Sequence, residues 1–404
     1  MRKKLKIGIL GAGRGLSYKN VVSLIPNIEV FGICDFDERK LKNLKDEKIH
    51  TYNDFNKFIE NDFDILIVAN YCTEHVPYVI KGLQAGKHVL SEVIACKTLA
   101  EGVQLCREVE KAQKNDIFYM FGENYCYIDY IQEMEKIYKK GKIGEIRYGE
   151  GEYIHDCSQI WDKLTTSPNH WRNWIPSTYY CTHSLGPFIT ITDLRPISVS
   201  GFVVPNILSR KFGRKGDDWG ILIIKLENDA ILRIIPWSVG PHDSLWFRIY
   251  GTDGMMENKR WENTNILNVH FQKLFEKPKL KSYKPEYKIK KASKTGHGGA
   301  DFFVLYDFVK SIRKKQIPKI DVYKAMDMTL PGIIGYKSAL LGNMSLEIPD
   351  FRKEDIRKKY ENDNWSPDPK DRNLQENQPF PSILGEIEIE KEIYERLYGK
   401  KMKW

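Results

Sequence analysis

The chain has 404 residues, of which 42% are hydrophobic and 29% are charged. This composition indicates a globular protein with room for two or three domains. No apolar run approaches the roughly 20 residues of a membrane-spanning helix, so we expect no membrane partner. The net charge of +9 lies on no recognisable nucleic-acid-binding module, so we expect no nucleic acid either. Many lysines fall in residues 277–294, which we predict to be a solvated loop.

The first third of the chain alternates short apolar runs with amphipathic helical patterns. We predict strands at residues 7–10, 30–34, 65–69, 88–90 and 117–121, because each run is brief and apolar, as in a parallel strand covered on both faces. The clearest helix spans 98–114, where Thr98 can cap the helix and Glu101 follows three residues later. Repeated β-α units predict a doubly wound parallel sheet, a Rossmann domain, over residues 1–125.

Longer strands follow, which we place at residues 146–155, 197–204, 220–226, 231–237 and 245–250. Helices are predicted at 301–314 and 322–341, the second with a kink or break at Pro331. The α/β fold class therefore adds a second, α+β domain over 126–350, with a mostly antiparallel, open-faced sheet. We expect residues 351–404 to form a C-terminal extension that packs on the body or on a neighbouring subunit.

Seven cysteines form an odd set with no C-x-x-C pair, and the apolar run at 7–10 is too short for an export signal. We therefore expect reduced thiols and a cytoplasmic location. His155, Asp156 and His170 lack further ligands at a suitable spacing, so we expect no metal.

Gly11, Gly13 and Gly15 follow the first predicted strand. Such a loop lets the backbone approach a pyrophosphate at a helix N-terminus, although Leu16 stands where a G-x-G-x-x-G motif has its third glycine. Asp35 ends the second strand, where a carboxylate can bind the ribose hydroxyls and repel a 2′-phosphate. The pattern favours NAD over NADP. The alternatives are a plain tight turn for the glycines and a helix N-cap for Asp35.

Two further segments carry a family resemblance. The sequence Asn-Tyr-Cys-Thr-Glu-His at 70–75 and the stretch from Gly82 to Glu92 resemble the Gfo/Idh/MocA family. This resemblance implies a Rossmann domain, an open-faced sheet domain and a nicotinamide between them. Dehydrogenases of that family carry Glu-Lys-Pro and later Asp-x-x-x-His. Here Val93 follows Glu92 without a lysine, and Tyr179 replaces the Asp while His183 is kept.

The motifs at 92–93, 122–124, 153–156, 170–172, 180–187 and 296–301 are similar to glycoside hydrolase family 109, the NAD-dependent α-N-acetylgalactosaminidases. The loop at 175–178 departs from the family pattern, which leaves the sugar open. The resemblance implies sugar contacts at Tyr153, Arg172, Tyr180, His183 and Tyr323. For the cofactor it implies contacts at Arg14, Gly15, Asp35, Cys72, His75, Glu92, Val93, Asn124 and Tyr180, to which we add Gly11, Gly13 and Glu123 from their places at strand ends.

A glycosidic bond can be cut without two flanking carboxylates if the sugar is transiently oxidised at C3. The C3 ketone makes the C2 hydrogen acidic, so that the C1 substituent can leave by elimination across C1–C2. Water then adds to the double bond, and the ketone is reduced again. We predict catalytic roles for His183, Tyr180 and Tyr153, with His183 as proton acceptor. Either phenol could donate a proton or, ionised near Arg172, accept one. Glu92 and Glu123 could instead be ordinary buried acids, and His297 either approaches the pocket or shapes a loop.

Three hypotheses follow: a glycosidase of this kind, a sugar or cyclitol dehydrogenase that oxidises a glycoside at C3, and a non-enzymatic nucleotide-binding sensor. The partner expected in the first two is a small carbohydrate. An open sheet face would need a cover, which favours a homodimer or homotetramer.

Overall fold

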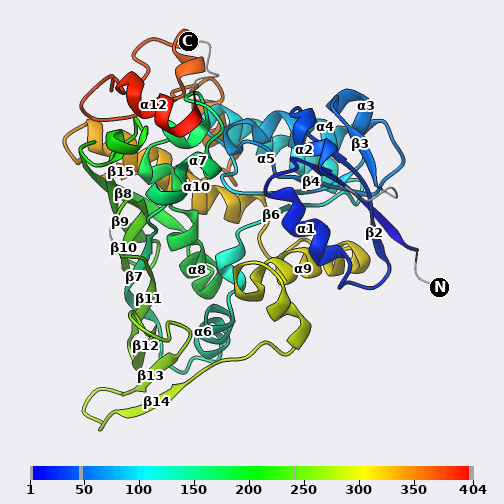
Figure 1. Ribbon diagram of the computed structural model, residues 1–404. Coiled ribbons are helices and arrows are strands. Elements are labelled where there is room, and N and C mark those ends of the chain that lie inside the picture. Colours follow the sequence, from blue (N-terminus) through cyan, green and yellow to red (C-terminus); the bar gives the residue numbers. More distant parts are fainter. Residues whose placement is uncertain (1–2, 45–48, 241, 400–404) are drawn as a thin grey trace.

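The computed structural model describes residues 3–44, 49–240 and 242–399, and it contains two sheets with helices packed on them (Figure 1). The first sheet has six parallel strands in the order β3-β2-β1-β4-β5-β6. The predicted doubly wound sheet is thereby confirmed. Its elements are β1 (Leu5–Leu10), α1 (Gly15–Val22), β2 (Ile28–Cys34), α2 (Glu38–Lys42), β3 (His50–Tyr52), α3 (Phe55–Ile59), β4 (Ile65–Val68), α4 (His75–Gln84), β5 (His88–Ser91), α5 (Leu99–Gln113) and β6 (Tyr119–Phe121).

Local sequence accounts for most of this domain. All four residues of β4 are buried, as an apolar parallel strand requires. The Thr98 side chain accepts a hydrogen bond from the backbone N–H of Glu101 and caps α5, as predicted. Strand β3 was missed because its three residues are polar or aromatic and lie partly exposed at the edge of the sheet.

The second sheet has nine strands in the order β14-β13-β12-β11-β7-β10-β9-β8-β15, and of these neighbours only β7 and β10 run parallel. Its strands are β7 (Ile146–Ile154), β8 (Pro196–Val204), β9 (Trp219–Leu226), β10 (Ile231–Ser238), β11 (Ser244–Gly251), β12 (Gly254–Asn258), β13 (Leu267–Phe271), β14 (Lys279–Tyr283) and β15 (Leu346–Glu347). Its helices are α6 (Asp129–Lys139), α7 (Trp161–Leu164), α8 (Thr182–Thr192), α9 (Ala300–Lys314) and α10 (Val322–Leu340).

Two predictions for this domain were wrong in detail. Residues 279–283 are not loop but the edge strand β14, which pairs with β13 while all five residues stay exposed. Lysines suit such an edge because they discourage pairing with another chain. Of the kink or break predicted at Pro331, the break does not occur, because helix α10 runs through Pro331. A proline inside a helix costs about 3 kcal/mol, which the burial of most of α10 in the core offsets.

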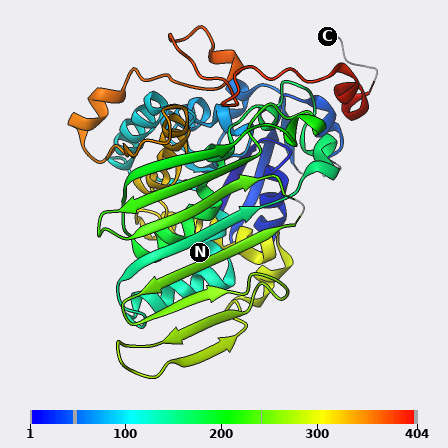
Figure 2. The ribbon, with the colours of Figure 1, turned by 90° about the vertical axis from the view of Figure 1, so that its left-hand side faces the viewer.

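Helices α6, α8 and α10 cover one face of the large sheet, and the other face carries no helix in the described part of the chain (Figures 1 and 2). Phe202, Ile221 and Ile223 lie on this open face, and Phe202 remains 42% exposed. The sheet is therefore open-faced, as the sequence predicted.

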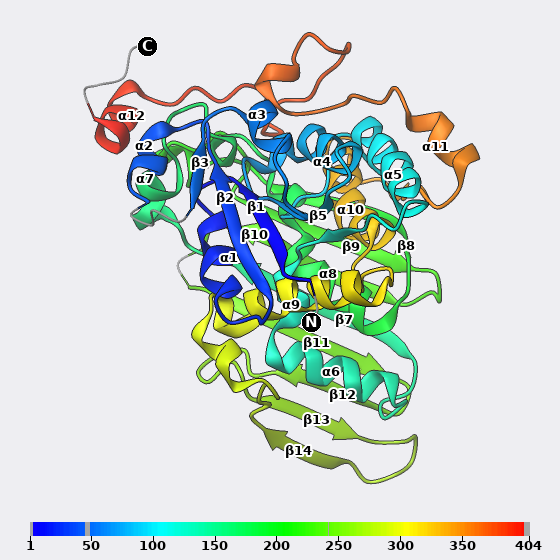
Figure 3. The ribbon, with the colours of Figure 1, turned by 90° about the vertical axis from the view of Figure 1, so that its right-hand side faces the viewer.

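The C-terminal segment crosses both domains, from α11 (Glu354–Tyr360) beside α5 to α12 (Lys391–Tyr398) beside α7 (Figure 3). Lys97 pairs with Asp368 and Asp371 along the way. Further on, the Ser382 hydroxyl donates to Asp217. This segment thus contacts both the Rossmann domain and the second domain and links them. No helix among the described residues is long and apolar enough to cross a bilayer.

Candidate functional site

The glycine loop after β1 is shaped by close backbone contacts. A Cβ on Gly11, whose φ is +101°, would lie 2.4 Å from the carbonyl oxygen of Ala69, and one on Gly15 would lie 2.5 Å from Ile9 Cγ2. Gly15 thus provides the close contact between helix and strand that the motif's third glycine usually makes, which explains why Leu16 is tolerated. Gly13 faces open space. The loop therefore leaves room for a phosphate at the start of α1.

Asp35 belongs to this loop and not to a helix cap. Its Oδ2 accepts the backbone N–H of Ala12 at 2.7 Å, and its Oδ1 accepts that of Asp37 at 2.8 Å. The N-cap of α2 is Asp37, whose side chain accepts from the N–H of Arg39. The carboxylate of Asp35 is thereby fixed beside the glycine loop.

Arg14 ties the glycine loop to the start of α9. Its Nε donates to Glu92 Oε1 at 2.9 Å, and its two terminal nitrogens donate to the two oxygens of Asp301, each at 2.7 Å. Tyr18 also donates to Glu92 Oε1. Burial opposes ionisation of Asp301, but hydrogen bonds from Arg14 and His297 hold the pKa of that carboxyl below its usual value. No local pattern in the sequence predicts this role of Asp301.

His297 acts mainly on this ion pair. Its Nδ1 lies 3.0 Å from Asp301 Oδ1, and Asn124 Nδ2 donates to the same oxygen at 3.2 Å. The ring centroid of His297 is 6.4 Å from that of Tyr125. His297 is thus held by Asp301 at the start of α9.

Several buried polar atoms at the carboxyl edge of the first sheet have no hydrogen-bond partner among the described residues. They are Nδ2 and Oδ1 of Asn70, Nε2 of His75, Oε2 of Glu123 and Oδ1 of Asn124. Burial lowers the pKa of His75, so its ring is neutral. Cys72 and Val93 are buried at the same edge. Unsatisfied polar groups beside an open glycine loop fit a polar dinucleotide such as NAD.

The predicted catalytic residues come together around His183, at the start of α8. Its Nδ1 lies 2.7 Å from Oε1 of the fully buried Glu123. Tyr125 stacks on the imidazole at a centroid distance of 4.3 Å. Tyr153 and Tyr180 meet the ring edge-on at 4.8 and 5.0 Å. Sequence reasoning missed Tyr125 and the pairing of Glu123 with His183.

Glycines bring α8 close enough to form this cluster. A Cβ on Gly151 of β7 would lie 2.3 Å from the carbonyl oxygen of Ser184, and one on Gly186 of α8 would lie 2.8 Å from Glu123 Cγ. The first contact sets His183 beside Tyr153, two residues along β7 from Gly151 and on the same face of the strand. The second sets it beside Glu123.

Burial raises the pKa of the hydroxyls of Tyr153 and Tyr180 well above the usual value, and the opposing effect of Arg172 is smaller. Both phenols are therefore neutral hydrogen-bond donors near neutral pH, and the structure does not favour an ionised tyrosine as a base.

A cavity of about 140 Å³ adjoins the cluster. Arg172 lines it, with its guanidinium 4.2 Å from the centroid of the Trp171 ring, and has no ion-pair partner among the described residues. Lys97 cannot replace the missing lysine after Glu92, because it is bound to the C-terminal segment. Arg172 is thus the one arginine or lysine among the described residues that line this cavity. The cavity is lined by Tyr153, His155, Cys157, Ile160, Trp161, Leu164, Trp171, Arg172, Ile175, Tyr180 and Trp237.

Tyr323 is not brought to this cluster. Its hydroxyl donates to Glu110 of α5, and its ring lies under Arg352 at 5.4 Å. The sugar contact expected of Tyr323 has no support from this placement.

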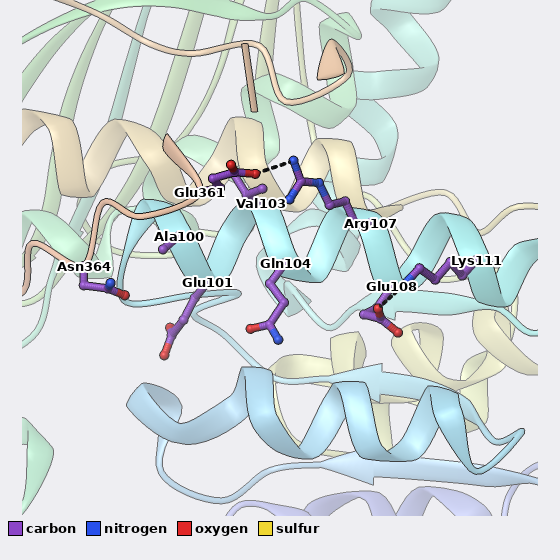
Figure 4. Close-up of a pocket in the computed structure, with 9 residues that line it drawn as sticks. All are labelled: Ala100, Glu101, Val103, Gln104, Arg107, Glu108, Lys111, Glu361 and Asn364. Atoms are coloured by element: carbon purple, nitrogen blue, oxygen red, sulfur yellow. Dashed lines mark hydrogen bonds and ion pairs between the residues drawn. The ribbon is translucent and has the colours of Figure 1, made fainter. Parts of the chain in front are cut away.

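A larger hollow of about 410 Å³ lies at α5 (Figure 4). It does not match the predicted site, because charged side chains such as Arg107 and Glu361 line it and pair with each other.

No group of three or more His, Cys, Asp or Glu side chains in the described residues is placed to hold a metal ion. The candidate site therefore consists of the glycine loop, the Arg14 ion pair, the His183 cluster and the adjoining cavity.

Comparison with known proteins agrees with this geometry. Residues 5–120 match the oxidoreductase family with an NAD-binding Rossmann fold, Gfo/Idh/MocA, and residues 236–358 match the glycosyl hydrolase 109 C-terminal domain. An α-N-acetylgalactosaminidase of Tannerella forsythia is 26% identical over 86% of either chain, and a glycosyl hydrolase family 109 protein of Parabacteroides distasonis is 24% identical over 87% of either.

Solved structures share the fold. An oxidoreductase domain protein from Kribbella flavida superposes with a TM-score of 0.72 at 18% identity, covering 86% of this chain and all of its own. Levoglucosan dehydrogenase in complex with NADH and levoglucosan gives a TM-score of 0.71 at 19% identity, covering 86% of this chain and 99% of its own. The chain thus combines a match to the NAD-binding Rossmann fold of the Gfo/Idh/MocA oxidoreductase family with a match to the glycosyl hydrolase 109 C-terminal domain.

Proposed function

We propose that this protein is an NAD-dependent glycoside hydrolase acting on an N-acetylgalactosaminide or a related hexoside. The proposal is supported by the family 109 C-terminal domain and by the name of the Tannerella forsythia relative. The observation that carries it is the pairing of His183 with the buried Glu123 inside a ring of tyrosines, at a site without the usual lysine.

NAD⁺, when bound, supplies a hydride acceptor for C3 of the sugar, and the hydride is returned at the end of the cycle. Gly13, Asp35, Asn70 and Asn124 are the residues proposed to hold it, from their place at the carboxyl edge of the first sheet. The orphaned atoms of the two asparagines would gain partners on binding.

His183 accepts the proton of the C3 hydroxyl, and Glu123 stabilises the imidazolium that results. Once C3 is oxidised, the C2 hydrogen is acidic, and a base removes it as a proton while the C1–O bond breaks and the leaving group takes up a proton to depart as an alcohol. Water then adds to the C1–C2 double bond, with its hydroxyl at C1 and its proton at C2. Tyr153 and Tyr180 donate hydrogen bonds to the oxygen that gains charge, and Arg172 adds a positive charge beside them.

The alternative is a dehydrogenase that oxidises a glycoside at C3, and the fold shared with levoglucosan dehydrogenase supports it. The absence of a lysine after Glu92 favours the hydrolase, because Lys97 is engaged elsewhere. A non-enzymatic nucleotide-binding sensor is less well supported, because the relatives named above carry the names of enzymes.

The test uses purified protein without added cofactor, incubated in deuterium oxide with 4-nitrophenyl glycosides of both anomers. We expect released nitrophenol and a product sugar that carries deuterium at C2. Accumulation of NADH with intact glycoside would support the dehydrogenase instead. Nitrophenol release without exchange at C2 would contradict the elimination mechanism.

We further propose that the protein is cytoplasmic and forms a homodimer or homotetramer through the open face of the large sheet. Seven buried, unpaired cysteines support the first proposal. Phe202, Ile221 and Ile223 on the open face support the second. Sedimentation analysis of wild-type protein and of Ile223→Glu tests the assembly, which should dissociate in the variant.

A further inference from the structure

The C-terminal helix α12 packs on α7, which forms part of the wall of the cavity beside the His183 cluster (Figure 3). Resting on the proposed function, we propose that Tyr398, the last residue of α12, is a positioning residue for this cavity. Its hydroxyl fixes the turn Trp171–Asn173, and this turn holds Arg172 and Tyr180 in place for the sugar. Tyr398 lies beyond residues 236–358, which match the glycosyl hydrolase 109 C-terminal domain.

The hydroxyl of Tyr398 belongs to a closed circle of hydrogen bonds. It accepts from Nδ2 of Asn173 at 3.2 Å and lies 2.7 Å from Oγ1 of Thr165. The Thr165 hydroxyl donates to the carbonyl oxygen of Trp161 at 2.6 Å, so Tyr398 is the donor toward Thr165. Nε1 of Trp161 donates to Oδ1 of Asn173 at 2.8 Å, which completes the circle. Because Thr165, Trp161 and Asn173 are fully buried, loss of the Tyr398 hydroxyl would leave a buried oxygen without its donor.

Asn173 connects this circle to the turn Trp171–Asn173. Besides its contact with Tyr398, its Nδ2 donates to the carbonyl oxygens of Ser167 and Pro168. Its backbone N–H donates to the carbonyl oxygen of residue 170, which closes the turn. Arg172 is the middle residue of the turn, so its position depends on how firmly the side chain of Asn173 is held.

Trp171, the first residue of the turn, contacts the polar groups of the cavity. The Arg172 guanidinium lies 4.2 Å from the centroid of the Trp171 ring, and Tyr180 stacks on the same ring at 6.0 Å. Tyr180 in turn meets the His183 ring at 5.0 Å. A displacement of the turn would therefore move the cation and the phenol that the proposed mechanism uses. Misplacing such groups by about 1 Å can cost roughly 100-fold in rate.

Helix α12 is also anchored by contacts that do not involve Tyr398. Arg396 donates to the carbonyl oxygen of Lys211 at 2.9 Å. A Cβ on Gly213, whose φ is +90°, would lie 2.8 Å from Leu397 Cδ1, so the helix packs closely there. Loss of the Tyr398 hydroxyl should therefore leave α12 in place, and Tyr398→Phe reports on the hydrogen-bond circle.

The first measurement is hydrogen–deuterium exchange of the purified protein with its cofactor. Tyr398→Phe keeps the ring and removes the hydroxyl, and the amides of residues 161–175 should exchange about five-fold faster, as expected for one lost hydrogen bond. Thr165→Val removes the other hydroxyl of the circle and should act alike; it serves alone if Tyr398→Phe does not fold. Tyr336→Phe is the matched control, because the Tyr336 hydroxyl donates to the carbonyl oxygen of Phe380 in the same C-terminal segment. It should leave exchange at 161–175 unchanged.

The second measurement is steady-state hydrolysis of the best nitrophenyl glycoside. Tyr398→Phe should lower kcat/KM about ten-fold, and the loss should fall mainly on kcat, since Arg172 and Tyr180 act on charge that develops during the reaction. The variant should retain its NAD. Combining Thr165→Val with Tyr398→Phe should lower the rate no further than either change alone, because both open the same circle. Tyr336→Phe should keep the wild-type values.

The outcomes separate this inference from the proposed function. Unchanged exchange in Tyr398→Phe, additive losses in the double variant, or loss of NAD would overturn the inference while hydrolysis by the wild type stands. Faster exchange without a change in kcat would also overturn it, because the circle would then hold the wall without positioning the polar groups. Faster exchange in a protein whose wild type cleaves no glycoside would overturn the proposed function and support the hold of Tyr398 on the turn.

Discussion

Nδ1 of His183 lies 2.7 Å from Oε1 of Glu123, and the carboxyl group of Glu123 has no exposure to solvent. The two residues are 60 positions apart, on α8 and directly after β6. A buried carboxylate at this distance fixes the orientation of the imidazole.

The first prediction concerns this pair. His183→Ala should lower kcat at least about 100-fold, because a positioned general base contributes about 10²–10⁴. Glu123→Gln should lower kcat less, since the neutral amide keeps the shape but not the charge. Steady-state rates on the best nitrophenyl glycoside measure both effects. His270→Ala on β13, far along the sheet, is the control and should keep the wild-type rate; a His183→Ala enzyme with a near-normal rate would remove His183 from the mechanism.

The second prediction concerns the approach of α8 to β7. Gly151→Ala would place a Cβ 2.3 Å from the carbonyl oxygen of Ser184. We expect a loss of about 1–3 kcal/mol in the free energy of unfolding, together with lower activity, because α8 carries His183. Urea denaturation measures the loss. Glu150→Gln, a nearly isosteric change on the opposite face of the strand, should leave activity unchanged. Equal stability of Gly151→Ala and wild type would show that the contact is not tight.

The third prediction concerns the choice of cofactor. Asp35→Ser removes the carboxylate beside the glycine loop, so the purified variant should retain less NAD after dialysis and should accept NADP better than wild type. Cofactor content after acid release gives the measurement. Asp37→Ser alters the neighbouring acid but keeps a helix-capping side chain, and it should retain NAD fully. Unaltered NAD retention in Asp35→Ser would place the ribose elsewhere.

The fourth prediction concerns pH. Burial, with a smaller effect of Arg172, lowers the pKa of His170 to about 3, whereas an exposed histidine titrates near about 6.5. Between these values the unfolded chain binds a proton that the folded chain does not, so the stability present above about pH 6.5 is lost as the pH falls. The loss at pH 5 is on the order of 2 kcal/mol.

His170→Asn keeps an acceptor for the backbone N–H of Arg172 and removes the titrating ring. Its free energy of unfolding should fall less between pH 7 and pH 5 than that of wild type. Denaturation followed by tryptophan fluorescence at both pH values decides this. Parallel losses in the two proteins would mean that His170 is not the group responsible.

Several features of this protein depend only on neighbouring residues and can be predicted from the amino-acid sequence. The apolar runs of the Rossmann strands, the cap at Thr98, the glycine loop and the position of Asp35 follow from side-chain periodicity and backbone sterics, which act within a few residues. The edge strand β14 was not predicted, because its exposed residues form no apolar pattern.

Which distant residues contact one another depends on the fold of the whole chain. Arg14 and Asp301 are 287 positions apart and form a bidentate ion pair, whereas Tyr323 is held against Glu110 and away from the His183 cluster. These contacts depend on how closely the helices and strands pack. Close approaches such as that between Gly151 and Ser184 set this spacing. A linear pattern does not contain these distances, since they arise from the packing of the whole chain.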